Sequence, residues 1–152
     1  LKERGLPGNI AISLSVGMVV LFGAAGVFEP FSHRAWAMFV VGILYTLARE
    51  IVKDVEDMEG DEGRSTYAMR VGPQQARAVV WVLLLLTLAS ILLPFTIGVF
   101  PEHHLIGVVP AVVLLLMVKP KLVLSEDRAA QQLIKKSMYL VLAAFLVSAL
   151  LA

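Results

Sequence analysis

The chain has 152 residues, of which 59% are hydrophobic and 16% are charged, against roughly 25% charged residues in an ordinary soluble domain. A soluble domain of this size cannot bury so much apolar surface, which argues against a water-soluble enzyme. A disordered chain is excluded because disorder requires low hydrophobicity. Basic and acidic residues nearly cancel, 13 against 12, and no nucleic-acid-binding surface is predicted. There is no cysteine, which excludes disulfides and thiolate metal sites.

Five apolar segments predict an all-α, multi-pass transmembrane helical bundle. The uncharged runs 5–28 and 78–101 have 24 residues each, more than the ~20 that a helix needs to cross the hydrocarbon core. Three shorter runs, of 14, 14 and 16 residues, can span if flanking side chains such as Lys119 reach the interface. Pro94 and Pro110 are expected to kink or end helices. The five expected spans cover residues 9–28, 35–56, 76–98, 104–124 and 134–152.

The basic residues between these spans predict the orientation of the protein. From the N-terminal segment onward, the successive connections carry 2, 1, 5, 0 and 5 Lys or Arg residues. This alternation is typical of a chain whose N-terminal side is cytoplasmic, so we expect an integral cell-membrane protein with the 101–104 loop outside. The polar segment 125–136 is expected to form a surface helix with Leu133 and Ile134 against the membrane.

The acidic residues gather at the cytoplasmic end of the second expected span, where seven of the twelve fall within residues 50–62. If one helix continues through this segment, Glu50, Asp54, Asp57 and Asp61 share a stripe about 60° wide. Like charges at this spacing repel, and desolvation near a membrane adds to the cost, so a bound cation would stabilise the stripe. Carboxylate oxygens suit a hard divalent ion, magnesium above all, which often binds substrate phosphates as well. The pattern predicts a metal–diphosphate site.

A solvated acidic loop is the simpler explanation of such a segment. Against it, the acids share one helical face, begin inside a membrane-bounded helix and lie where ionisable residues are usually functional. Lys53 borders the stripe and would either contact a diphosphate or neutralise its acidic neighbours. Tyr45 and Thr46 precede the stripe and would face a cavity, although ordinary packing explains them more simply.

Residues 50–61 read E-I-V-K-D-V-E-D-M-E-G-D and resemble the second aspartate-rich motif of the UbiA superfamily of intramembrane prenyltransferases. The Ser-Thr pair at 65–66, the Val-Gly pair at 71–72 and the opening residues 1–9 also fit the pattern of that family. The form of the acidic motif is similar to the branch that makes archaeal-type ether lipids. The resemblance covers residues 1–152 as helices five to nine of a nine-helix fold.

This resemblance implies Mg²⁺-dependent transfer of a prenyl group, geranylgeranyl in this branch, from a prenyl diphosphate to a lipid-phosphate acceptor. The acceptor would be geranylgeranylglyceryl phosphate, and the product an ether lipid. Metal ions would stabilise the leaving pyrophosphate while an allylic cation forms and the acceptor hydroxyl attacks it. The residues implied for metal binding and catalysis are Asp54, Asp57 and Asp61, with Glu50 as a further metal ligand, and those implied for the diphosphate are Lys53, Arg64 and Lys2.

The same family has a first aspartate-rich motif, N-D-x-x-D-x-x-x-D, which is missing from this sequence. Because the chain also begins at Leu1 rather than at a methionine, we expect it to be the C-terminal half of a longer enzyme. Its partner would be the N-terminal half, without which we expect it to be inactive.

Two alternatives remain open. A UbiA-type enzyme that acts on an aromatic, quinone-precursor or chlorin acceptor would share the metal site and differ in its acceptor pocket. A non-enzymatic transporter or structural membrane subunit would explain the spans. It would not explain four carboxylates on one stripe at a span's end, because transporters more often place acids near the bilayer midplane.

Overall fold

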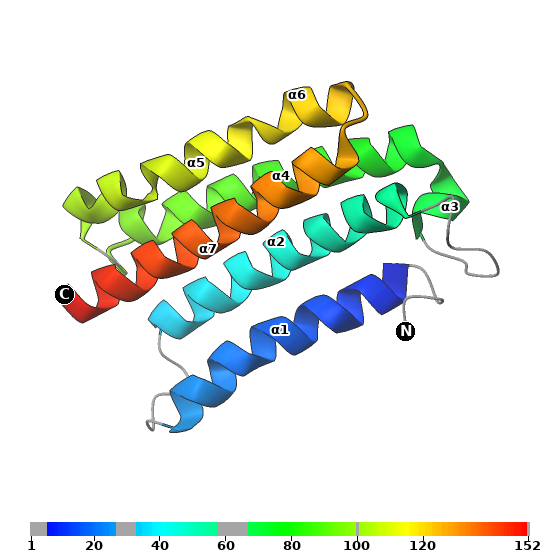
Figure 1. The fold of residues 1–152 in the computed structure, drawn as a ribbon. Coiled ribbons are helices and arrows are strands. Elements are labelled where there is room, and N and C mark those ends of the chain that lie inside the picture. The colour runs from blue at the N-terminus through cyan, green and yellow to red at the C-terminus, as the bar shows by residue number, and fades with distance from the viewer. Residues whose placement is uncertain (1–5, 27–32, 58–66, 100, 152) are drawn as a thin grey trace.

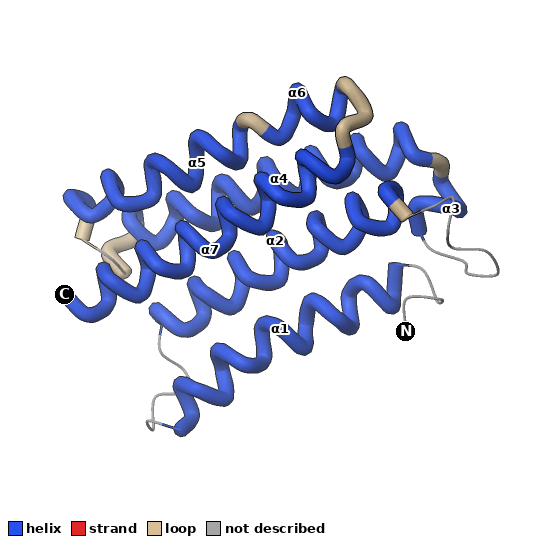
Figure 2. The backbone as a smooth tube through the Cα atoms, in the orientation of Figure 1, coloured by secondary structure: helices blue, strands red, loops and turns tan. Residues whose placement is uncertain are grey.

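The computed structural model describes residues 6–26, 33–57, 67–99 and 101–151. Within these ranges there are helices and no strands, which confirms the predicted all-α class (Figure 2). The helices are α1 (Leu6–Gly26), α2 (His33–Glu56), α3 (Tyr67–Val71), α4 (Pro73–Thr96), the 3₁₀ helix η3 (Glu102–Val108), α5 (Val109–Leu116), α6 (Val118–Val123) and α7 (Asp127–Leu151). The long helices lie side by side in one bundle (Figure 1).

Helix α2 lies at the centre of this bundle. It packs against α1, α4 and α7, while α5 and α6 lie along α7 (Figure 1). Large side chains from several helices are fully buried around it, among them Tyr45 and Ile51 on α2, Leu84 on α4 and Phe145 on α7. The part of α2 that carries Glu50 and Asp54 is therefore enclosed by other elements, while its last residue, Glu56, is exposed.

The outer surface of the bundle is suited to lipid. In the described ranges, three helical segments are long and apolar enough to cross a membrane: Ala35–Glu56, Pro73–Thr96 and Glu102–Val123. Large apolar side chains such as Leu86 on α4 and Val147 on α7 are more than half exposed. Such a surface would promote association in water, whereas acyl chains cover it in a bilayer. The chain is an integral membrane protein, and the full set of five spans stays a prediction.

Glycine and proline set several helix boundaries. Gly72, with a φ of 89°, separates α3 from α4, and Pro73 then begins α4. Pro94 lies in the last turn of α4, which ends at Thr96, and Pro110 lies in the first turn of α5. The expectation that each proline kinks or ends a helix agrees with α4, which ends two residues beyond Pro94, whereas Pro110 instead begins a helix, where a missing N–H costs no intrahelical hydrogen bond.

The expected surface helix over residues 125–136 is wrong. Asp127–Leu151 is one continuous helix, α7, and Ile134 on it is completely buried in the core. Leu133 is partly buried against the same core. The sequence misled because exposed polar side chains recur every four residues from position 128 to 136, which hides the apolar stripe on the opposite face of the helix.

Helices α1 and α2 approach each other closely at Gly17. A Cβ atom at this position would lie 2.9 Å from Ile43 Cγ1 and 2.9 Å from two ring carbons of Phe39. A residue without a side chain is therefore required for this separation, as is common between membrane helices. Because α1 and α2 run in opposite directions (Figure 1), the first turns of α1 lie beside the last turns of α2.

A chain of hydrogen bonds joins α2, α7 and α5 in the interior. Ser137 Oγ donates to the Ala111 carbonyl oxygen at 2.7 Å, and the Tyr45 hydroxyl lies 2.7 Å from Ser137 Oγ. Since the single Ser137 hydroxyl proton is already used, Tyr45 is the donor to Ser137. Tyr45 is therefore a packing residue, as the simpler explanation predicted, and the nearby Thr46 is also buried.

Candidate metal–diphosphate site

Two members of the predicted acidic stripe, Glu50 and Asp54, lie in the last turns of α2. Glu50 and Asp54 lie one turn apart and are 7% and 1% exposed. The helix ends at Glu56, and the backbone N–H of Asp57 closes the last turn by donating to the Lys53 carbonyl oxygen at 3.0 Å. The Asp57 side chain is exposed. The stripe thus runs from the interior of the bundle at Glu50 to its surface at Asp57.

This position is unfavourable for carboxylates and favourable for a cation. Burial removes the hydration of Glu50 and Asp54, and two like charges four residues apart on a helix repel. The C-terminal end of a helix also carries the negative end of the helix dipole, which attracts a cation. A divalent ion bound between the two carboxylates would offset both costs.

The other predicted site residues have different environments. Lys53 on α2 is half-buried beside the stripe, where either of its two predicted roles remains possible. Lys2, Asp61 and Arg64 lie outside the described residues. The described part of the predicted site therefore consists of Glu50, Lys53, Asp54 and Asp57, all on or next to the end of one helix.

The available oxygen donors fit a hard divalent cation. In the part of the chain that the structure describes, no three His, Asp or Glu side chains form a group that could hold a metal ion. Glu50 and Asp54 supply two buried carboxylates, so further ligands must be other oxygen atoms. Magnesium is commonly held in this way, by one or two carboxylates together with water and substrate phosphates. The donor set therefore fits a metal that binds with its diphosphate substrate.

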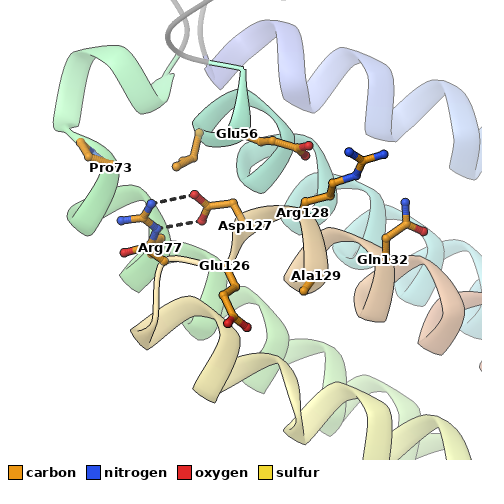
Figure 3. A pocket seen from close by; sticks show the side chains of 10 residues that line it. Glu56, Pro73, Arg77, Glu126, Asp127, Arg128, Ala129 and Gln132 are labelled. Carbon is orange, nitrogen blue, oxygen red and sulfur yellow. Dashed lines mark hydrogen bonds and ion pairs between the residues drawn. The ribbon is translucent and has the colours of Figure 1, made fainter.

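An open cleft of about 1070 Å³ lies next to the acidic end, between the last turn of α2 and the first turns of α4 and α7 (Figure 3). Glu56 lines this cleft and does not belong to the acidic stripe. Across its wall Arg77 donates two hydrogen bonds to Asp127, from Nε to Oδ1 at 2.8 Å and from Nη2 to Oδ2 at 2.7 Å. Sequence analysis missed this pair, because 50 residues separate its members and no local pattern marks either one.

Asn9, on α1, is a second residue to which sequence analysis gave no role. It is completely buried, and neither Oδ1 nor Nδ2 forms a hydrogen bond with any described residue. A signal was present in the sequence, since Asn9 is the only amide side chain in the uncharged run 5–28.

Comparison with known proteins decides the family. The chain matches the UbiA prenyltransferase family over residues 1–150. It belongs to the UbiA prenyltransferase family. The resemblance inferred from the acidic motif is thereby confirmed, and the metal dependence general among UbiA prenyltransferases agrees with the oxygen donors on α2.

Several UbiA relatives share one name. The chain is 34% identical to the digeranylgeranylglyceryl phosphate synthase of Haloquadratum walsbyi, over 95% of this chain and 51% of that protein. It is 36% identical to the protein of the same name in Halobacterium salinarum, over 99% and 54%. A solved structure, described as giving insights into digeranylgeranylglyceryl phosphate synthase in membranes, is similar with a TM-score of 0.84 and 28% identity, over 98% of this chain and 55% of that one. The chain thus spans about half the length of these relatives.

Proposed function

We propose that this UbiA chain forms the C-terminal half of a Mg²⁺-dependent digeranylgeranylglyceryl phosphate synthase. The whole enzyme would transfer the geranylgeranyl group of a prenyl diphosphate to geranylgeranylglyceryl phosphate. The observation that carries this proposal is the pair of buried carboxylates, Glu50 and Asp54, at the membrane-bounded end of α2. The acceptor is supported by the names of the relatives.

In this function Glu50, Asp54 and Asp57 hold the cation, and Asp61 extends the same set of ligands. Bound Mg²⁺ would neutralise the diphosphate and stabilise it as a leaving group. The bond between the allylic carbon and the diphosphate oxygen breaks, a bond from that carbon to the acceptor oxygen forms, and the proton of the acceptor hydroxyl leaves with the released diphosphate or passes to water.

The basic residues predicted to bind the diphosphate have a separate role. Lys53 contacts the diphosphate from α2, while Lys2 and Arg64 supply further positive charge to it. The site lies on the cytoplasmic side, as the distribution of basic residues between the spans supports. The prenyl chains of both substrates then lie in the membrane, and their phosphate groups reach the site from the cytoplasmic interface.

A product assay tests this proposal. The full-length protein in membranes is incubated with Mg²⁺, geranylgeranyl diphosphate and geranylgeranylglyceryl phosphate, and in parallel with an aromatic acceptor. We expect digeranylgeranylglyceryl phosphate that requires Mg²⁺ and is lost in the Asp57→Ala variant. Transfer only to the aromatic acceptor would overturn the lipid assignment. If the Asp57→Ala variant forms the lipid product undiminished, Asp57 is not a ligand of the metal.

A further inference from the structure

The buried amide of Asn9 lacks the partners that such a group normally has. Asn9 lies in the first turn of α1 and is 0% exposed, and its Oδ1 and Nδ2 make no hydrogen bond among the described residues. One turn later, the buried Ser13 hydroxyl donates a hydrogen bond to the Asn9 backbone carbonyl oxygen at 2.8 Å. The Ser13 hydroxyl therefore has a partner within the helix, unlike the Asn9 side chain. Since buried amides in folded proteins are nearly always hydrogen-bonded, the Asn9 side chain is suited to a ligand.

The contact at Gly17 shows what lies opposite this amide. Gly17 meets Phe39 and Ile43 on the antiparallel α2. Asn9 is eight residues before Gly17, about 12 Å along α1 at 1.5 Å per residue. The same distance along α2 from Phe39 and Ile43 leads to positions 47 to 51. Asn9 is therefore level with the turn of α2 that carries Glu50.

The facing sides of the two helices agree with this register. On α2, Ile43, Glu50 and Asp54 lie within about 40° of one another around the helix axis. The side of α2 that meets α1 at Gly17 is therefore the side that carries the acidic stripe. On α1, the buried face that includes Gly17 also includes Asn9. A neutral oxygen donor on α1 is thus level with two carboxylates on the facing side of α2.

We propose that Asn9 Oδ1 is a ligand of the divalent cation held by Glu50 and Asp54. This inference rests on the proposed function and adds a ligand from a second helix. Hard cations accept amide oxygens, and the described His, Asp and Glu side chains do not form a complete site by themselves. With Oδ1 on the cation, Nδ2 donates to an oxygen of the diphosphate that the cation binds. Both unpaired atoms of the buried amide are then used.

Direct measurement of Mn²⁺ binding tests this assignment without relying on catalysis. The full-length protein in detergent is titrated with Mn²⁺, and free Mn²⁺ is followed by electron paramagnetic resonance, with and without inorganic pyrophosphate. We expect Asn9→Leu to weaken Mn²⁺ binding by roughly 10- to 100-fold. Asn9→Asp, which keeps an oxygen at this position, should restore binding. Ser13→Ala, one turn away on the same face, should bind as the parent protein does.

Two further measurements separate the possible failures. Without metal, Asn9→Leu should unfold at the same temperature as the parent protein or a higher one, because it removes an unpaired buried amide. Unchanged Mn²⁺ affinity in Asn9→Leu together with lost affinity in Asp54→Asn would overturn the role of Asn9 and leave the proposed site intact. Retained affinity in Asp54→Asn would overturn the site itself. Equal weakening in Asn9→Leu and Asn9→Asp, with lowered unfolding temperatures, would assign Asn9 to packing and also overturn the inference.

Discussion

Buried polar side chains of the bundle fall into two groups with different chemistry. In the interior, the Tyr45 hydroxyl donates a hydrogen bond to Ser137, and Ser137 donates one to the backbone carbonyl oxygen of Ala111. At the end of α2, Glu50 and Asp54 place two acids in nearly complete burial, where a bound cation would stabilise their negative charge. The first group holds helices together, and the second provides a place for a ligand.

The hydrogen-bond chain should contribute measurably to stability. Tyr45→Phe removes one donor and leaves the Ser137–Ala111 bond intact, so we expect a loss of about 0.5–1.5 kcal/mol in the free energy of unfolding. Ser137→Ala should cost more, because it leaves both the Tyr45 hydroxyl and the Ala111 carbonyl without their partner. Unfolding in mixed detergent micelles measures both losses. Tyr139→Phe, at an exposed tyrosine on α7, is the control, and a loss equal to that of Tyr45→Phe would contradict the prediction.

Among the elements, α2 keeps its place through two kinds of contact. Helix α1 comes close to it because Gly17 has no side chain. On the other side, α4 and α7 pack on α2 and are joined to each other at their first turns by the Arg77–Asp127 pair, whose side chains are each 11% exposed. A paired, hydrogen-bonded arginine and carboxylate so far from solvent fixes the relative position of two helix ends.

The close approach at Gly17 predicts a position-specific effect of added methyl groups. Gly17→Ala brings a Cβ atom within 2.9 Å of Ile43 and Phe39, and the repacking that it forces should cost about 1–3 kcal/mol. Gly42→Ala is the matched control on α2, where a Cβ meets no described atom within 4 Å. Since alanine favours a helix, Gly42→Ala should be neutral or stabilising by up to ~1 kcal/mol. Equal thermal stability of the two variants would contradict this packing.

Sequence alone predicted the features that depend on local pattern. The acidic stripe follows from the spacing of Glu50 and Asp54, and the end of α4 two residues after Pro94 agrees with the helix-breaking effect of proline. What the sequence did not predict depends on which helices meet. The role of Asn9 needs the register of α1 on α2, which a single sequence does not encode locally.

At the scale of the whole molecule, positive charge distinguishes the two ends of the bundle. The connection from α6 to α7 lies at the same end as the acidic stripe and is flanked by Lys121 and Arg128 (Figure 1). The opposite end carries a single basic residue, Arg34 in the first turn of α2, and η3 contains His103 and His104 but neither Lys nor Arg. This asymmetry supports placing the stripe on the cytoplasmic side.

Single cysteines test this orientation, because the chain has none of its own. Glu126→Cys, next to α7, and His103→Cys, in η3, both replace exposed residues. In intact cells that carry a full-length form without other cysteines, a membrane-impermeant maleimide should label His103→Cys. It should label Glu126→Cys only after the membrane is permeabilised. The reverse pattern would place the acidic stripe on the outer side.

The proposal that the buried end of α2 forms the metal–diphosphate site is tested most directly by comparing Asp54→Asn with Glu56→Gln. The two substitutions remove one negative charge each, two residues apart on the same helix, but Asp54 is buried in the stripe and Glu56 is exposed on the neighbouring cleft. The measurement is the initial rate of digeranylgeranylglyceryl phosphate formation by the full-length protein at saturating Mg²⁺. We expect Asp54→Asn to lower this rate on the order of 10²- to 10³-fold, because charge stabilisation of the leaving diphosphate is lost, and Glu56→Gln to leave it nearly unchanged. A rate for Asp54→Asn that matches the rate for Glu56→Gln would contradict the placement of the site.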